Sequence, residues 1–284
     1  MTEPVNRQPR YWEEGHLSFS GGGFIGIYHV GVAIAFKKFA PHITSRKVLG
    51  ASSGALASMC LVTNMPIDQI IKGIATMSTH CRSLALGPFD PRFSIFNIMK
   101  TALTENACED AHQISTNKLF ISLTRATTLE NKMMSDFESR EELIDVLLAS
   151  CFIPYFLGLV PPTIRGVSYI DGGFTDNLPT HDENTITVSP FAGMATIRPR
   201  PSTSKLPDII YTPENAIRMV KTVFSPPPKA LAEVCQEGFK DALEFIREHD
   251  LFACESCALL PNKPETRSCR RCLDLISEAE NAGV

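Results

Sequence analysis

The chain has 284 residues, enough for one large domain or for one domain with a small appendage. Its 44% hydrophobic and 20% charged residues are ordinary globular composition, so we expect a sizeable buried core. The formal charge of -4 at pH 7 leaves no polycationic field, which argues against nucleic acid partners and against purely electrostatic binding to anionic membranes. Any contact with lipid is therefore expected to be mainly apolar.

The first fifteen residues are polar and contain two prolines, so they lack the apolar stretch of a secretory signal peptide. No apolar run long enough to span a bilayer follows, and the sequence holds no N-x-S/T glycosylation site. We therefore expect a cytoplasmic protein that is soluble or peripherally bound. The expected organisation is a polar segment over residues 1–15, one domain over residues 16–248 and a Cys-rich tail over residues 249–284.

Short apolar runs alternate with longer amphipathic ones, as in α/β layered domains. In the first part of the chain this pattern predicts strands at His16–Ser20 and at 47–51, and helices at Ile27–Phe39, from Ser53 to about Thr63, and from Pro66 to His80. Further on it predicts strands at Leu119–Arg125, Asn131–Phe137, 166–171 and 184–191, a helix behind the capping box Ser139/Glu142, a surface loop at 199–213 and an amphipathic helix at Lys229–Arg247.

Residues 50–54 read GASSG, an instance of the G-x-S-x-G pattern in which a strand ends in a sharp turn that presents a serine nucleophile. Ser52 takes the serine position, between a predicted strand and a helix of small residues. The free N–H groups at the start of that helix favour negative charge developing near Ser52. Ser53 is the rival nucleophile, and a strand-to-helix turn without chemistry is the alternative.

Residues 21–26 read GGGFIG, between the first strand and the first helix. The spacing fits the G-x-G-x-x-G dinucleotide fingerprint, but residues 40–50 contain no acidic residue to bind a ribose. An oxyanion hole, in which the amides of Gly22 and Gly23 face an ester carbonyl oxygen, uses the same bare backbone. We favour the oxyanion hole, with a plain tight turn as the alternative.

A serine nucleophile also needs a base. Of the seven histidines, only His181 and His249 follow the acidic candidates in the usual hydrolase order, and neither lies in a recognisable motif. Asp171 instead ends a predicted strand in SYIDGGFTDNLP, where two glycines follow and bring its carboxylate to a sheet edge. A hairpin with Asp-Gly in its turn is the alternative.

The glycine loop, GASSG and DGG, in this order, resemble the patatin-like phospholipase domain family, in which a serine and an aspartate act as a dyad without histidine. The stretches FSGGGFIGIYHVGVA, GASSGALAS, ISLTR, FIPYFLGLVPPTIRGVSYIDGGFTDNLP, NTITVSPF and VFSPPP are similar to the animal subgroup that includes adipose triglyceride lipase and adiponutrin. The resemblance covers roughly Leu17 to Arg247. It implies an α/β fold of three layers with a central, mostly parallel sheet.

The resemblance also implies roles for individual residues. Ser52 would be the nucleophile, Asp171 its base, and Gly21, Gly22 and Gly23 the oxyanion hole, with no cofactor for catalysis. The motif glycines would be Gly26, Gly50, Gly54, Gly172 and Gly173. The broad family often has a basic residue before the last glycine of the loop, whereas this chain has Ile25, so any role of that charge is absent.

The activity implied is a serine lipid acyl hydrolase that releases fatty acid from neutral acylglycerols, as a triacylglycerol lipase does. Phospholipase, retinyl ester hydrolase and acylglycerol transacylase activities are alternatives, and so is a non-catalytic protein that keeps the fold to bind lipid. The implied partners are a lipid ester, the surface of a lipid droplet or membrane, and a coactivator protein. The apolar stretches FIPYFLGLV and IFNIM are candidates for an acyl-chain groove, with ordinary core as their alternative.

Four of the nine cysteines crowd into the tail as CESC and CRRC, two C-x2-C pairs separated by eleven residues. The four thiolates of Cys254, Cys257, Cys269 and Cys272 match a structural zinc site, although the separation is shorter than usual. Arg267, Arg270 and Arg271 would offset their negative charge. Two disulfides, or free thiols, are the alternatives. The scattered cysteines are expected to be ordinary thiols in a reducing compartment.

Overall fold

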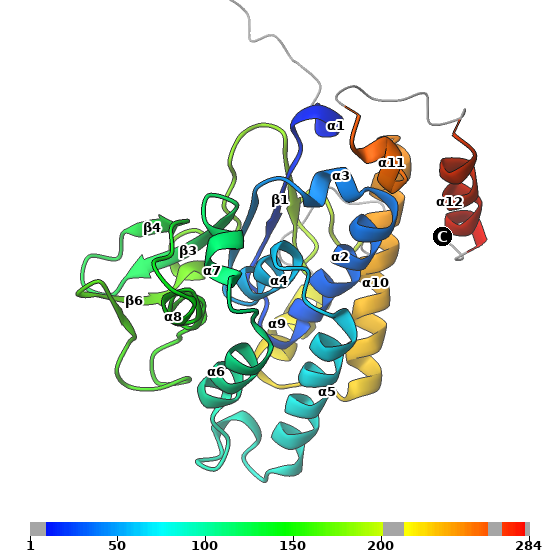
Figure 1. The fold of residues 1–284 in the computed structure, drawn as a ribbon. Helices are drawn as coiled ribbons and strands as arrows, with labels where there is room; N and C mark the ends of the chain where they lie inside the picture. The colour runs from blue at the N-terminus through cyan, green and yellow to red at the C-terminus, as the bar shows by residue number, and fades with distance from the viewer. Residues whose placement is uncertain (1–9, 201–212, 261–268, 282–284) are drawn as a thin grey trace, which may run out of the picture.

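One seven-stranded sheet forms the centre of the described protein. The computed structural model describes residues 10–200, 213–260 and 269–281 (Figure 1). The strands are β1 (His16–Phe19), β2 (Val48–Ala51), β3 (Leu119–Arg125), β4 (Asn131–Met134), β5 (Thr163–Ile164), β6 (Val167–Asp171) and β7 (Thr185–Val188). β7, β1, β2 and β3 are parallel neighbours, whereas β4 and β6 run antiparallel to β3 and β5 pairs with β6. The predicted mostly parallel sheet is confirmed.

Helices surround this sheet, so the fold is mixed α/β. They are α1 (Tyr11–Glu14), α2 (Ile27–Phe39), α3 (Pro41–Thr44), α4 (Ser53–Val62), α5 (Ile67–Ser83), α6 (Ile95–Asn106), α7 (Ala111–Ser115), α8 (Arg140–Ser150), α9 (Pro213–Val223), α10 (Pro228–Glu248), α11 (Glu255–Ala258) and α12 (Arg270–Asn281). Three short 3-10 helices are η1 (Gly23–Gly26), η2 (Gly87–Phe89) and η3 (Gly172–Phe174).

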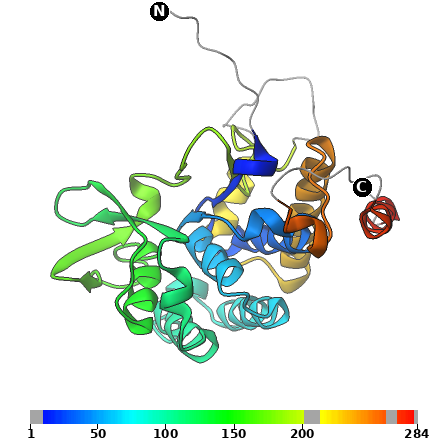
Figure 2. The ribbon, with the colours of Figure 1, turned by 45° about the horizontal axis from the view of Figure 1, so that its top comes forward.

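Some helices contact the strands directly, and others pack on those helices. α4 contacts β1, β2 and β3, and α8 contacts β3 and β6. α2 packs against α4, and the long α10 lies along α2, as Figures 1 and 2 both show. A hydrogen bond of 2.6 Å from the Tyr28 hydroxyl to Asp241 Oδ2 joins α2 to α10. All four residues of β2 are buried, and β1, β3 and β7 are buried at most positions, as strands covered on both faces should be.

The predicted elements differ from the observed ones mainly at their ends. α2 and β3 have the predicted bounds, and Ser139 caps α8 by accepting a 3.1 Å hydrogen bond from the Glu142 amide. α5 begins one residue after Pro66 and continues to Ser83. β7 ends at Val188, because Ser189 bonds instead to Ile197 and the following proline has no N–H. Most of the loop predicted at 199–213 lies outside the described residues.

None of the helices in the described ranges has both the length and the apolar character needed to cross a bilayer.

Candidate active site

Ser52 lies at the tip of a sharp turn between β2 and α4. Its backbone has φ 54° and ψ -128°, a strained conformation for a residue with a side chain. The turn brings α4 so close to β1 that a Cβ atom at Gly54 would lie 2.2 Å from the Phe19 carbonyl oxygen, which only glycine avoids. The Ser52 amide donates a 2.9 Å hydrogen bond to the Ser150 hydroxyl, which donates in turn to the Ser122 carbonyl. The surrounding structure therefore holds the strained turn in place.

The register of β3 places Asp171 beside this turn. Ser122 pairs with Ala51 at the end of β2, and the next residue, Leu123, pairs with Asp171 at the end of β6. β4 pairs with both Ser122 and Leu123, so β2 and β6 must meet end to end along the other edge of β3. The carboxyl ends of two strands that are far apart in the sequence therefore face each other, and Ser52 and Asp171 are brought together.

The Asp171 carboxyl group is almost completely buried, with 6% of the residue exposed. Burial raises its pKa to about 6, although hydrogen bonds from Ser52 and from the Gly173 amide (2.7 Å) favour the ionised form. The chain after Asp171 continues into η3, so the alternative hairpin turn is not formed. Gly172 makes this path possible, because a Cβ atom there would lie 2.1 Å from the Ser122 carbonyl oxygen.

The glycine loop lies against the same turn, but its amides differ in what they bind. The Gly21 amide donates to Asn177 Oδ1 at 3.1 Å, and the Gly22 amide donates to the Ser53 hydroxyl at 2.9 Å. Within the described residues the amides of Gly23 and Ser53 have no protein acceptor. Ser53, the rival nucleophile, is thus bound to the glycine loop. These two amides therefore remain free to donate a hydrogen bond to a bound group.

Two residues that were not predicted from the sequence also belong to the site. Asn177 joins the glycine loop to the turn after β6, since both Gly21 and Gly173 lie against its side-chain oxygen. Cys151, at the end of α8, interacts with the Ser52 side chain, and burial and the neighbouring Asp171 raise the pKa of its thiol. Both are brought to Ser52 by tertiary packing, although Asn177 lies in the same FTDNLP stretch as the aspartate motif.

Three of the histidines contact groups other than Ser52. His29 is fully buried and bonds through Nε2 to the Ser20 carbonyl oxygen at 2.8 Å, and burial lowers its pKa to about 4. His181 Nε2 lies 2.8 Å from Lys47 Nζ, and the His249 ring packs at a tilt against the Phe245 ring. In the described part of the chain, no histidine hydrogen-bonds to Ser52.

Ser52 and Asp171 line a cavity of about 1000 Å³. Its wall is largely apolar and comes from α2, α4, α5 and α6, of which α5 and α6 lie together at one end of the molecule (Figure 1). Both stretches predicted as groove candidates contribute, with Ile95, Ile98 and Met99 from one and Ile153, Phe156 and Leu157 from the other. The volume is at the upper end of the range for small-molecule sites, and the lining suits long hydrocarbon chains.

Comparison with protein families agrees with this geometry. A family model described as patatin-like phospholipase matches residues 17–183, which is more than half of the chain and includes Ser52, Asp171 and the glycine loop. The chain belongs to the patatin-like phospholipase family. The predicted membership is thereby confirmed, and the domain can be called a patatin-like domain.

Several curated proteins are similar to this patatin-like domain. Patatin-like phospholipase domain-containing protein 2 of Mus musculus is 38% identical over 246 residues, covering 83% of this chain and 51% of its own. The human 1-acylglycerol-3-phosphate O-acyltransferase PNPLA3 is 37% identical, covering 82% and 50%. The human omega-hydroxyceramide transacylase is 34% identical, covering 81% and 45%. The chain thus spans about half the length of these relatives.

Among solved structures, VipD from Legionella pneumophila is similar with a TM-score of 0.50 and 14% sequence identity, over 84% of this chain and 67% of that one. At this identity the likeness shows the fold alone. It agrees with the predicted patatin-like fold class. Together, the comparisons show that the chain is a patatin-like phospholipase family member whose similar proteins include one named as an acyltransferase and one named as a transacylase.

Proposed function

We propose that this patatin-like domain is a serine acyl hydrolase that cleaves neutral acylglycerols, with triacylglycerol as the preferred class. The observation that supports it most directly is that Ser52 and the buried Asp171 meet in the lining of a large apolar cavity. A buried carboxylate is a stronger base than a solvated one, and a water-poor site strengthens every charge interaction within it. An apolar wall with few charges suits acyl chains better than a charged headgroup.

The proposed reaction proceeds through an acyl-enzyme. The ionised Asp171 accepts the hydroxyl proton of Ser52 while the serine oxygen attacks the ester carbonyl carbon. The carbonyl oxygen becomes an oxyanion, for which the Gly23 and Ser53 amides and the N-terminal end of α4 supply hydrogen bonds and favourable charge. When the tetrahedral intermediate collapses, the alcohol leaves with the proton from Asp171, and the acyl group stays on Ser52. Water then attacks this ester with Asp171 again as the base, releasing the fatty acid.

A transacylase is the second candidate, and the names of two relatives favour it. In that reaction the hydroxyl group of an acylglycerol, instead of water, attacks the acyl-Ser52 ester. The apolar cavity supports this route because it can hold an acceptor with its own acyl chain and limit the entry of water. The two candidates share every step up to the acyl-enzyme.

The surroundings of the cavity suit a lipid surface. Exposed aromatic and methionine side chains form an apolar rim, defined here as Phe89, Phe174, Met219 and Phe224. Phe174 and Met219 line the cavity while 58% and 60% exposed, and Phe89 contacts both Phe156 of the cavity wall and Phe224. We propose that this rim rests on a lipid droplet or a cytoplasmic membrane, from which the substrate passes into the cavity.

Two variants test the dyad. Ser52→Ala removes the nucleophile and Asp171→Asn removes the base while keeping the shape of the side chain, so each should lower ester hydrolysis by ~1000-fold or more. Fatty acid released from emulsions of triacylglycerol, phospholipid and retinyl ester would measure both the loss and the substrate class. Reaction of the wild type with a fluorophosphonate reports the activated serine independently of the substrate.

His181→Ala is the matched control, because this histidine follows Asp171 in the sequence but lies against Lys47. It should hydrolyse esters as the wild type does. Full activity in folded Asp171→Asn, or loss of activity in His181→Ala, would contradict the proposed Ser52–Asp171 dyad. A wild-type protein that binds lipid but never reacts with the fluorophosphonate would instead be a non-catalytic lipid-binding protein.

A further inference from the structure

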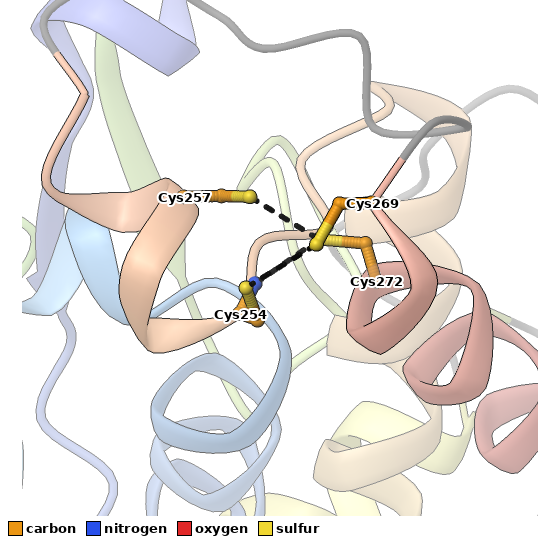
Figure 3. Close-up of side chains that lie close together, drawn as sticks. All are labelled: Cys254, Cys257, Cys269 and Cys272. Carbon is orange, nitrogen blue, oxygen red and sulfur yellow. Dashed lines mark hydrogen bonds between the residues drawn. The ribbon is translucent and has the colours of Figure 1, made fainter.

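Four cysteine sulfur atoms converge where the tail meets the patatin-like domain (Figure 3). Cys254 precedes α11 and Cys257 lies within it, whereas Cys269 precedes α12 and Cys272 lies in its first turn. The four Sγ atoms all lie within 4.8 Å of one another. The Cys254–Cys269 and Cys257–Cys272 Sγ pairs are each 3.7 Å apart. Each short pair therefore joins one C-x2-C motif to the other.

We propose that these four thiolates bind one structural zinc ion. A tetrahedral zinc with Zn–S bonds of about 2.3 Å holds its sulfur atoms about 3.8 Å apart, close to the spacing observed. A disulfide would instead need the two sulfur atoms at about 2.05 Å. The separation of eleven residues between the two motifs is thus no obstacle, since the sulfur atoms already converge from both.

The surroundings of the sulfur atoms suit a charged metal–thiolate centre. The Cys254 amide lies 3.3 Å from Cys272 Sγ and donates a hydrogen bond to it, the kind of contact that orients and stabilises a thiolate ligand. Cys254, Cys257 and Cys272 are buried and Cys269 is partly exposed, so solvent reaches the cluster from one side only. Zinc with four thiolates carries a net charge of about -2, and Arg270 of α12 is adjacent in the chain to Cys269.

The site has a structural and not a catalytic role, because protein sulfur would fill all four positions and leave none for water or substrate. The position of the site indicates which segments a bound zinc would connect. The Ala253 amide donates to the Phe39 carbonyl oxygen at 2.8 Å, and the Phe252 and Phe39 rings meet edge to face. Zinc would bind α12 to this anchored segment, at the end of α2 opposite the glycine loop.

Metal analysis of the purified full chain tests the proposal. Protein prepared with a thiol reductant and without added metal should contain about one zinc per chain by mass spectrometry. Cobalt exchanged into the site should give the intense near-ultraviolet thiolate bands and the visible bands of a tetrahedral sulfur site. Cys254→Ser combined with Cys257→Ser should lose the metal, whereas Cys108→Ser, which removes an exposed cysteine outside the cluster, should keep it.

The proposal does not rest on the hydrolase activity, and the readouts are separate. Removing the metal with a chelator should make the chain after His249 sensitive to protease, and adding zinc back should restore resistance, while reaction of Ser52 with a fluorophosphonate persists. Substoichiometric zinc in the wild type that added zinc does not raise would overturn the proposal. So would a count of free thiols in the unreduced, denatured protein showing the four cysteines paired as disulfides, or zinc retained in the double variant.

Discussion

The chemistry proposed for the site depends on the environment of one carboxyl group. Asp171 accepts hydrogen bonds from Ser52 and Gly173, both of which favour its ionised form, yet burial has the larger effect and its pKa rises to about 6. A base in this range is ionised at neutral pH and still able to accept a proton in the transition state. Gly172 and Gly173 let the backbone turn away directly after Asp171, so that the chain does not cover the carboxylate.

The raised pKa predicts how the reaction varies with pH. Only ionised Asp171 can act as a base, so the rate should rise with pH through an apparent pKa of about 6 and then level off. At about pH 5 the rate should be about a tenth of its plateau, because about a tenth of the carboxyl groups are ionised there. Hydrolysis of a soluble ester, expressed as kcat/KM in the free enzyme, is the measurement. A rate that stays constant or falls between about pH 5 and about pH 8 would contradict the assignment of the base.

At the same scale, the sequence predicts which residues meet but not how their neighbours are bound. Short motifs mark Ser52 and Asp171 as candidates, because strand ends and glycine turns have local signatures, and the family resemblance implies that the two act as a dyad. The hydrogen bond from the Gly22 amide to Ser53, and the contacts of Asn177 with the glycine loop, join segments far apart in the chain. No local pattern specifies such contacts, so the hydrogen-bond partners of the Gly21 and Gly22 amides could not be predicted from the sequence.

At the scale of elements, the cavity is formed because α5 and α6 supply walls opposite the turn that carries Ser52. α5 presents Ile74 to the cavity, and on the same helix Ile71 faces a separate depression against α10. Ile74→Trp should fill part of the cavity and lower kcat/KM for long-chain esters by about tenfold, while short-chain esters react nearly as before. Ile71→Trp adds the same bulk outside the cavity and serves as the control. Equal effects on both chain lengths would count against an acyl-chain role for this wall.

The helices differ in how well the sequence predicts them. α2 is flanked by glycine at its start and by Pro41 just after its end, so both bounds could be placed. α6 was not predicted as a helix, although Ser94 caps it and Ile95, Ile98, Met99 and Leu103 recur at helical spacing. From the sequence, the apolar residues of α6 fit a buried core and a groove wall equally well. Only the position of α5 across the cavity shows that they line a groove. That position is a property of tertiary packing.

At the scale of the whole molecule, net charge and surface apolarity lead to the same expectation for lipid binding. Binding that depends on the apolar rim should persist when salt is raised from about 0.1 M to about 1 M, which shortens the Debye length from about 10 Å to about 3 Å. Flotation of the protein with a neutral-lipid emulsion measures this. Phe89→Ser combined with Phe224→Ser should weaken binding by about tenfold, since exposed apolar area is lost, whereas Leu129→Ser, in a distant turn, should not. Release from the emulsion by salt alone would refute an apolar attachment.

The meeting of β2 and β6 along one edge of β3 has a consequence for how such a domain can diverge. The alignment of Ser52 with Asp171 is set by backbone pairing at two consecutive residues, Ser122 and Leu123, and not by a complementary pair of side chains. Loops and helices between the motifs can therefore lengthen, shorten or change sequence without moving the two groups apart. A shift of β6 by one residue, in contrast, would turn the carboxylate to the opposite face of the sheet. The sequence around such a site can therefore change widely, whereas the register of β2, β3 and β6 must be kept.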